Sequence, residues 1–232
     1  MSDEAALEAF RLADSFLPIG TFTASYGLEQ FVADGCVADG ADLEALLSSY
    51  LRRIVGPGDL VALRAAYTAT EDEDLDALCT ADRRLHATTL AAELRESACR
   101  AGERLLRLQC DVGDDPFLEA YAERVRRSES GDAPGTYAAV FGACTARRRV
   151  PVRRSALVYC HTFVTGLIGA AQRLVSLGHT EAQRALIALR PAMIAATEDS
   201  ADRSLDEMTP FAPLVDVLAA EHERADRRLF VS

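Results

Sequence analysis

The stretch VRRSALVYCHTFVTGLIGAAQRLVSL, residues 152–177, decides the fold class. Its apolar residues recur at steps of three and four, the spacing that gathers side chains on one face of an α-helix. One face holds Ala156, Cys160, Phe163, Leu167, Ala171 and Leu174, and a neighbouring face holds Leu157, Val164, Ile168 and Val175. A helix that is apolar around so much of its circumference is normally central. The sequence therefore predicts a helical bundle built around this segment, with a second helix close to its backbone at Gly166 and Ala170.

The rest of the chain is also helical in character. Ala, Leu, Glu and Arg, all good helix formers, dominate it, and no stretch keeps up a two-residue alternation. We expect helices near residues 4–16, 23–33, 43–54, 60–70, 81–108, 117–127, 137–146, 152–177, 181–195 and 212–227. Gly and Pro cluster between them, as in GPGD at 56–59 and SGDAPG at 130–135, and predict breaks there. None of these breaks is long or biased enough to be a linker, so residues 1–232 are expected to form a single all-α domain of about ten helices.

The charge is strongly acidic. The chain has 36 acids against 25 bases, a formal net charge of −11, and every base is Arg because the sequence contains no Lys. Such a surface repels nucleic-acid phosphates, which argues against a nucleic-acid partner. An acid excess without Lys also suggests an acidic surface of the halophilic type, adapted to a salt-rich cytoplasm, and we treat this as a hypothesis.

The sequence predicts a soluble, cytoplasmic protein. No apolar run reaches the roughly 18 residues that a membrane span needs. The start, MSDEAALEAF, carries acids where a signal peptide would carry bases. The six Cys form no C-x-x-C pair, and we expect them to be small buried apolar residues rather than a disulfide framework.

Motifs of catalysis and of metal binding are missing from the sequence. There are four His, but no H-E-x-x-H, no paired C-x-x-C and no G-x-S-x-G or G-x-G-x-x-G motif. A phosphate-binding loop of the G-x-x-x-x-G-K-[ST] type would need a Lys. His222 and Asp226 are four residues apart and could share a helix face, but such a pair supplies only half of a metal's ligands. This pattern favours a protein that binds partners, with His222 as the weak candidate for a metal ligand.

Residues 12–29, LADSFLPIGTFTASYGLE, closely resemble the N-terminal signature of the UreF family of urease accessory proteins. Thr21 stands where the family has a second Gly. The matching residues are Leu12, Asp14, Leu17, Pro18, Ile19, Gly20, Phe22, Ser25, Gly27, Leu28 and Glu29. Further segments resemble the family in the same order, namely ELRESACRAGERLLRL (93–108), VFGAC (140–144), AAQRLVSLGHTEAQRAL (170–186) and PLVDVLAAEHERADRRLFVS (213–232). In the last of these, Asp226 replaces a Tyr and Arg227 replaces a Ser.

The resemblance implies an all-α homodimer that is not itself an enzyme. It implies partners: the accessory protein UreD, also called UreH, the GTPase UreG, and apo-urease, into which their complex helps to insert nickel. Nickel and GTP would then be handled by the partner proteins, and this chain would bind no cofactor of its own. The alternative is a helical metal-binding protein that carries nickel directly through His222 and nearby acids.

The N-terminal signature supplies the first set of candidate interface residues. Pro18 removes a helical hydrogen bond and Gly20 permits a turn, so one apolar helix should fold back beside the next. This could present Phe16 and its apolar neighbours to a partner, or it could close the core, and composition does not separate the two. The candidates are Leu17, Pro18, Ile19, Gly20, Phe22, Ser25, Gly27 and Glu29.

The C-terminal segment supplies the second set. Its RRLF sequence places Arg beside aromatic and aliphatic residues, the types enriched at interface hot spots. The alternative is a terminal helix that docks on its own domain. The candidates are His222, Glu223, Arg228, Leu229 and Phe230.

Overall fold

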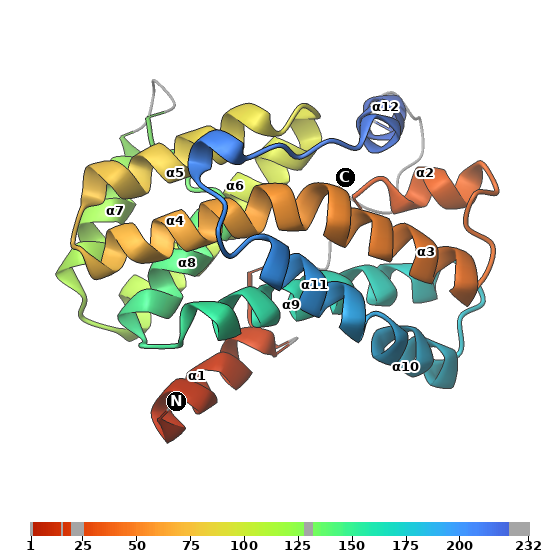
Figure 1. Ribbon diagram of the computed structural model, residues 1–232, viewed down its shortest axis with the longest axis horizontal. Coiled ribbons are helices and arrows are strands. Elements are labelled where there is room, and N and C mark those ends of the chain that lie inside the picture. The colour runs from red at the N-terminus through yellow and green to blue at the C-terminus, as the bar shows by residue number, and fades with distance from the viewer. Residues whose placement is uncertain (1, 15, 20–25, 128–131, 223–232) are drawn as a thin grey trace.

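The computed structural model describes residues 2–14, 16–19, 26–127 and 132–222 (Figure 1). These residues form helices and contain no strand, which confirms the predicted all-α class. The first half consists of α1 (Asp3–Ala13), α2 (Leu28–Ala33), α3 (Gly40–Tyr50), the π-helix η2 (Leu51–Asp59), α4 (Leu60–Glu71), α5 (Leu75–Thr88) and α6 (Ala92–Val112). The second half consists of α7 (Pro116–Arg126), α8 (Tyr137–Arg147), α9 (Val152–Leu174), α10 (His179–Ala188), α11 (Arg190–Asp199), the 3₁₀ turn η3 (Leu205–Glu207) and α12 (Pro213–His222). None of the described helices is both long enough and apolar enough to cross a bilayer.

The most completely buried helix is α8, and not α9 as the sequence suggested. Every residue from Tyr137 to Ala146 is buried. α4 lies along α8 so closely that a Cβ on Gly142 would be 2.3 Å from the Leu63 carbonyl oxygen, which explains why this position is Gly. The rings of Tyr137 and Phe141 then pack against Tyr159 of α9, with centroids 5.4 and 5.7 Å from the Tyr159 ring.

Helix α9 forms one wall of the core. Its predicted apolar face is largely correct, because Ala156, Cys160, Leu167 and Ala171 are buried. Its opposite face is only half-buried, with α1 packed against it at Val158. A Cβ added to Gly166 would meet no atom within 4 Å, so the close helix approach expected at this position is absent from the described residues.

The expected break at residues 56–59 is wrong, because η2 carries the chain from α3 into α4 without interruption. In an α-helix, Pro57 would leave the Arg53 carbonyl oxygen without its donor. Here the Phe211 N–H donates to that oxygen at 2.9 Å, and the Thr209 N–H donates to the Pro57 carbonyl at 3.1 Å. Gly58 lets Pro210 pack against the helix, since a Cβ there would lie 3.0 Å from the Pro210 Cβ. A distant segment therefore satisfies the backbone that Pro disrupts.

Three predicted helix boundaries also differ. The helix expected over 81–108 is two helices, and Arg95 fixes the turn between them by donating to the carbonyls of Thr89 and Leu90 at 2.8 and 2.6 Å. The helix expected over 181–195 divides at Leu189, where Pro191 occupies the first turn of α11 and needs no N–H partner. Helix α1 ends at Ala13 rather than near residue 16.

Asp82 of α5 is fully buried and joins three parts of the fold. One of its oxygens accepts hydrogen bonds from the Tyr121 hydroxyl and the Gly135 N–H at 2.8 and 2.7 Å. The other accepts from the N–H and the hydroxyl of Thr136, both at 2.7 Å. Burial raises the pKa of Asp82, and these four donors oppose that rise. The carboxyl group thus anchors α7 and the start of α8 to α5.

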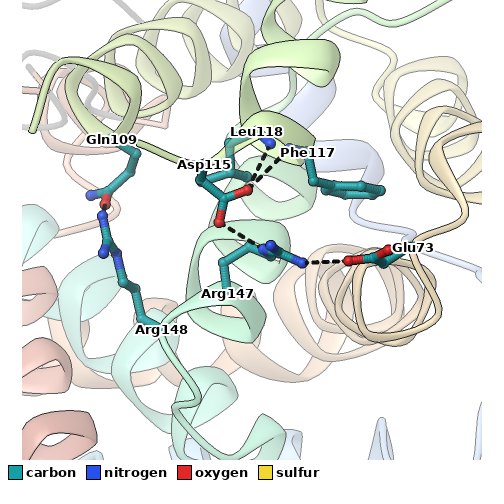
Figure 2. Close-up of polar contacts among 7 residues, drawn as sticks. All are labelled: Glu73, Gln109, Asp115, Phe117, Leu118, Arg147 and Arg148. Atoms are coloured by element: carbon teal, nitrogen blue, oxygen red, sulfur yellow. Dashed lines mark hydrogen bonds and ion pairs between the residues drawn. The ribbon is translucent and has the colours of Figure 1, made fainter. Parts of the chain in front are cut away.

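The other end of α8 is held by Arg147 (Figure 2). Its Nε donates to Asp115 at 2.7 Å and its Nη1 lies 3.3 Å from a Glu73 oxygen. The guanidinium group also lies over the Phe117 ring, 5.7 Å from its centroid. Asp115 at the same time caps α7 by accepting from the N–H groups of Phe117 and Leu118. This cluster ties together the ends of α4, α7 and α8.

Replacing Asp82 with Ala should lower the free energy of unfolding by at least about 3 kcal/mol, because it leaves four buried donors without an acceptor. Urea titration of both variants measures this. The exposed Asp76 on the same helix is the control, and its change to Ala should cost less than about 0.5 kcal/mol. Equal losses in the two variants would contradict the anchoring role.

Two Gly→Ala changes in neighbouring helices should have opposite effects. Gly142→Ala forces a Cβ against the Leu63 carbonyl and should destabilise the protein by about 3 kcal/mol or more. Gly169→Ala meets no atom within 4 Å and should stabilise α9 by up to about 1 kcal/mol. Thermal and urea unfolding measure both, and stabilisation by Gly142→Ala would show that α4 and α8 are farther apart than described.

Candidate interaction surfaces

The described part of the N-terminal signature lies mostly in the core. After α1 ends, the Leu17 N–H donates to the Asp14 carbonyl and the Ile19 N–H donates to the Leu17 carbonyl at 2.8 Å, so the chain turns sharply around Pro18. Leu17 and Ile19 are buried, whereas Pro18 is exposed and Phe16 is 90% exposed. The apolar residues of this turn thus divide between the core and the surface. Whether Leu17, Pro18 and Ile19 contribute to an interface stays a prediction.

The end of the signature forms the start of α2. Gly27 is buried, has φ +76°, and is the N-cap of α2, so a side chain there would be strained. Glu29 is half-buried in the first turn of the same helix. Gly20, Phe22 and Ser25 lie outside the described residues.

Tyr26 was not singled out from the sequence, yet it links the signature to the core. Its φ of +49° is unusual for a residue with a side chain. Its carbonyl accepts a hydrogen bond from the Tyr50 hydroxyl at 2.7 Å, and its ring packs edge-on against Phe163 with centroids 4.9 Å apart. These two contacts hold the strained backbone in place.

A small, mainly apolar cavity beside Tyr26 was also missed. It has a volume of about 30 Å³, room for a water molecule, and Tyr26, Tyr137, Tyr159 and Thr162 are among its lining residues. The Tyr137 hydroxyl is buried beside Thr162, and burial raises the pKa of Tyr137. No pattern in the sequence marks this group, because the four residues come from three distant segments.

Asp59, the last residue of η2, lies next to these tyrosines. Burial raises the pKa of Asp59 to about 7, and a hydrogen bond from the Tyr159 hydroxyl opposes the rise. Burial, and after it the nearby Asp59 charge, raises the pKa of Tyr26. The sequence placed Asp59 in a turn, where an Asp is ordinary and exposed, so its buried surroundings could not be foreseen.

Much of the C-terminal candidate set lies outside the described residues, namely Glu223, Arg228, Leu229 and Phe230. His222 is the last residue of α12, and its side chain is not described. The described side chains contain no group of three or more His, Cys, Asp and Glu that could hold a metal ion. The metal-ligand prediction for His222 therefore stays untested.

The segment that leads into α12 carries exposed apolar side chains. Phe211, Leu214 and Val217 are exposed, while Val215 and Leu218 turn inward against the core. Leu90, from the turn between α5 and α6, is also exposed and lines the same cavity as Phe211. We call Leu90, Phe211, Leu214 and Val217 the α12 patch. Neighbouring apolar side chains that remain exposed are typical of sites where proteins associate.

Comparison with known proteins agrees with the likeness seen in the motifs. The sequence model of the UreF family matches residues 37–190. The chain is 32% identical to the urease accessory protein UreF of Trichodesmium erythraeum over 232 residues, covering 100% of this chain and 98% of that protein. It is 28% identical to UreF of Bacillus sp. strain TB-90 over 226 residues, with 97% and 98% coverage. It is 29% identical to UreF 1 of Brucella melitensis over 226 residues, with 97% and 92% coverage.

Asp59 should make stability depend on pH. The unfolded carboxyl group releases its proton near pH 4 and the folded one near pH 7, so the folded state binds more protons between these values. The free energy of unfolding should therefore fall as pH rises from about 4 to about 7, by at most about 4 kcal/mol from this group. Asp59→Asn should remove this part of the pH dependence in urea titrations.

Asp76→Asn, at an exposed position, serves as the control and should keep the pH dependence of the wild type. A constant difference in stability between wild type and Asp59→Asn across this pH range would show that the Asp59 carboxyl group does not titrate there.

Proposed function

The chain belongs to the UreF family of urease accessory proteins, and we propose that it binds a UreD-type accessory protein and a UreG-type GTPase and helps to insert nickel into apo-urease. As an accessory protein of this family it is not itself an enzyme. In this proposal its contribution is to present surfaces that hold the other proteins together. Nickel and GTP are handled by those proteins, the work takes place in the cytoplasm, and the chain acts as a homodimer.

The observation that carries the proposal is the α12 patch. Three of its four exposed side chains, Phe211, Leu214 and Val217, come from a segment whose backbone is hydrogen-bonded to η2 at Thr209 and Phe211. The fourth, Leu90, lies in the turn whose carbonyls accept hydrogen bonds from Arg95. Leu214 and Val217 lie in the C-terminal segment that resembles the family, beside Asp216 of its motif. Preformed apolar surface lowers the entropy cost of association.

The direct experiment is co-purification. The tagged chain is expressed together with the urease subunits and the accessory proteins of its own cells, and the proteins it retains are identified. Retention of a GTPase and of urease subunits supports the proposal, and retention of neither one contradicts it. Light scattering of the purified chain measures the expected homodimer.

Leu214→Asp should weaken the association of the chain with its partner proteins at least about tenfold, because it places a charge in the centre of an apolar contact. The fold should remain intact, since Leu214 is exposed. Val112→Asp is the matched control, an exposed apolar residue at the end of α6 on a different surface. Circular dichroism confirms folding of both variants, and an equal loss of binding in both would exclude the α12 patch as the contact.

A further inference from the structure

A groove lies between helices α6 and α7. Only residues 113–115 connect the two helices, which pack against each other as an antiparallel pair. The groove has a volume of about 620 Å³, and the residues that line it are spaced three and four apart on each helix. On α6 they extend from Glu103 to Asp111, about 12 Å or two helical turns. The groove is therefore long enough to hold two turns of another helix.

The floor of the groove is apolar. Leu106 is buried beneath it, and Cys110, Ala122 and Val125 are half-buried. Because these three half-buried side chains keep part of their surface in contact with water, covering them would release that water and favour association. The groove thus combines a concave shape with an uncovered apolar surface.

The edges of the groove carry charged side chains, most of them without a partner. Glu103, Asp111 and Glu119 are exposed there and form no ion pair within the described part of the chain. Two arginines also line the groove, but Arg126 already forms an ion pair on α7 at 2.7 Å. Among the described residues at these edges, Arg107 is then the one base without an ion pair, and the unpaired charge is negative in sum.

Two of the acids lie at the end of the groove nearest the connection between the helices. Asp111 is next to the last residue of α6, and Glu119 lies in the first turn of α7. Burial raises the pKa of the Cys110 thiol most, and the charges of Glu119 and Asp111 raise it further, so both carboxylates are close to this thiol. A cationic group of a partner would be attracted to this end of the groove.

This combination fits an amphipathic helix. In complexes of this kind, the apolar face of the bound helix lies on the floor of an apolar groove, and its anchoring side chains recur at i, i+3, i+4 and i+7. Because the unpaired acids at the edges outnumber the unpaired bases, the complementary helix is basic. The groove shares no residue with the α12 patch, so the two surfaces can be occupied together.

We propose that the groove between α6 and α7 binds a basic amphipathic helix of a partner protein. The apolar side chains of that helix cover Cys110, Ala122 and Val125, and a Lys or Arg side chain of the helix lies between Asp111 and Glu119. This inference rests on the proposed function, since the partner would be one of the proteins that the chain binds during urease maturation.

The test uses a fluorescein-labelled helical peptide made of Lys, Ala and Leu, with its Leu residues on one face, and fluorescence anisotropy as the readout. The wild-type chain should bind this peptide, and the affinity should fall as salt rises, because the acids of the groove are exposed to solvent. A scrambled peptide of the same composition, with Leu spread around the helix, should bind at least about tenfold more weakly. Equal binding of the two peptides would overturn the proposal, because charge alone would then account for the binding.

Cys110 reports whether the peptide lies in the groove. Alkylation of the wild-type chain by iodoacetamide, followed by mass spectrometry, gives a rate for each Cys. Saturating peptide should slow the alkylation of Cys110 at least about tenfold, while the rate at the exposed Cys36, which does not line the groove, should change less than about twofold. This measurement needs no variant, so it does not depend on whether a variant folds. Peptide binding without protection of Cys110, or no binding at low salt, would overturn the proposal.

The double variant Asp111→Arg/Glu119→Arg should bind the peptide at least about tenfold more weakly, since each change replaces an attraction with a repulsion. The matched control is Asp3→Arg/Glu4→Arg, in the exposed first turn of α1, which changes the net charge by the same amount away from the groove. The affinity of the control should stay within about twofold of the wild type. Circular dichroism confirms that both double variants fold, and an equal loss of affinity in the two would overturn the proposal.

Two further outcomes would replace the proposed occupant with another and overturn the proposal. Protection of Cys110 that grows with the concentration of the chain alone would make the groove a contact between copies. Stronger protection by 8-anilinonaphthalene-1-sulfonate than by the peptide would make it a small-molecule site.

Co-purification separates this proposal from the proposed function. Retention of all partners by Asp111→Arg/Glu119→Arg at wild-type level would refute the groove as a binding site while leaving the proposed function intact. Failure of the wild type to retain any partner would count against the proposed function alone, because the Cys110 measurement tests the groove without the partners.

Discussion

The structure depends on the close backbone contact between α4 and α8 at Gly142, where the Leu63 carbonyl oxygen fills the space that a side chain would need. Together with α5, α6 and α9, α4 buries α8 from Tyr137 to Ala146, so the ends of α8 must be satisfied from within the fold. Asp82 accepts the Gly135 and Thr136 N–H groups at the helix N-terminus, and Arg147 pairs with Asp115 at the C-terminus. An acid at the positive end of the helix and a base at its negative end also suit the helix dipole.

The sequence could predict those parts of the fold that depend on residues close together along the chain, and not those that depend on distant ones. The helices were predictable because helical periodicity is local, and most of the apolar face of α9 was assigned correctly. The continuous helical path of the chain through η2 was not predictable, because Gly56, Pro57 and Gly58 are strong local signals for a helix break. The hydrogen bonds that overrule them come from Thr209 and Phe211, some 150 positions further along the chain.

For the candidate surfaces, too, the sequence identified some features and missed others. Sequence could name the apolar residues of the N-terminal signature, but Leu17 and Ile19 are buried while the neighbouring Phe16 is exposed. Core and interface share their composition, so only the fold separates them. Asp59 was missed for a related reason, since burial raises its pKa and the Tyr159 hydroxyl that opposes the rise lies on α9, which no local pattern brings next to it.

The segment that carries most of the α12 patch and helix α11 have a common support. The segment is hydrogen-bonded to η2 through Arg53 and Pro57, and α11 packs against the same π-helix. π-Helical segments are rare and often occur at functional sites. A protein that acts by binding partners needs its binding surfaces to keep fixed positions relative to one another. Here η2, with Pro57 between two glycines, holds the C-terminal segment and α11 in place, because both contact it directly.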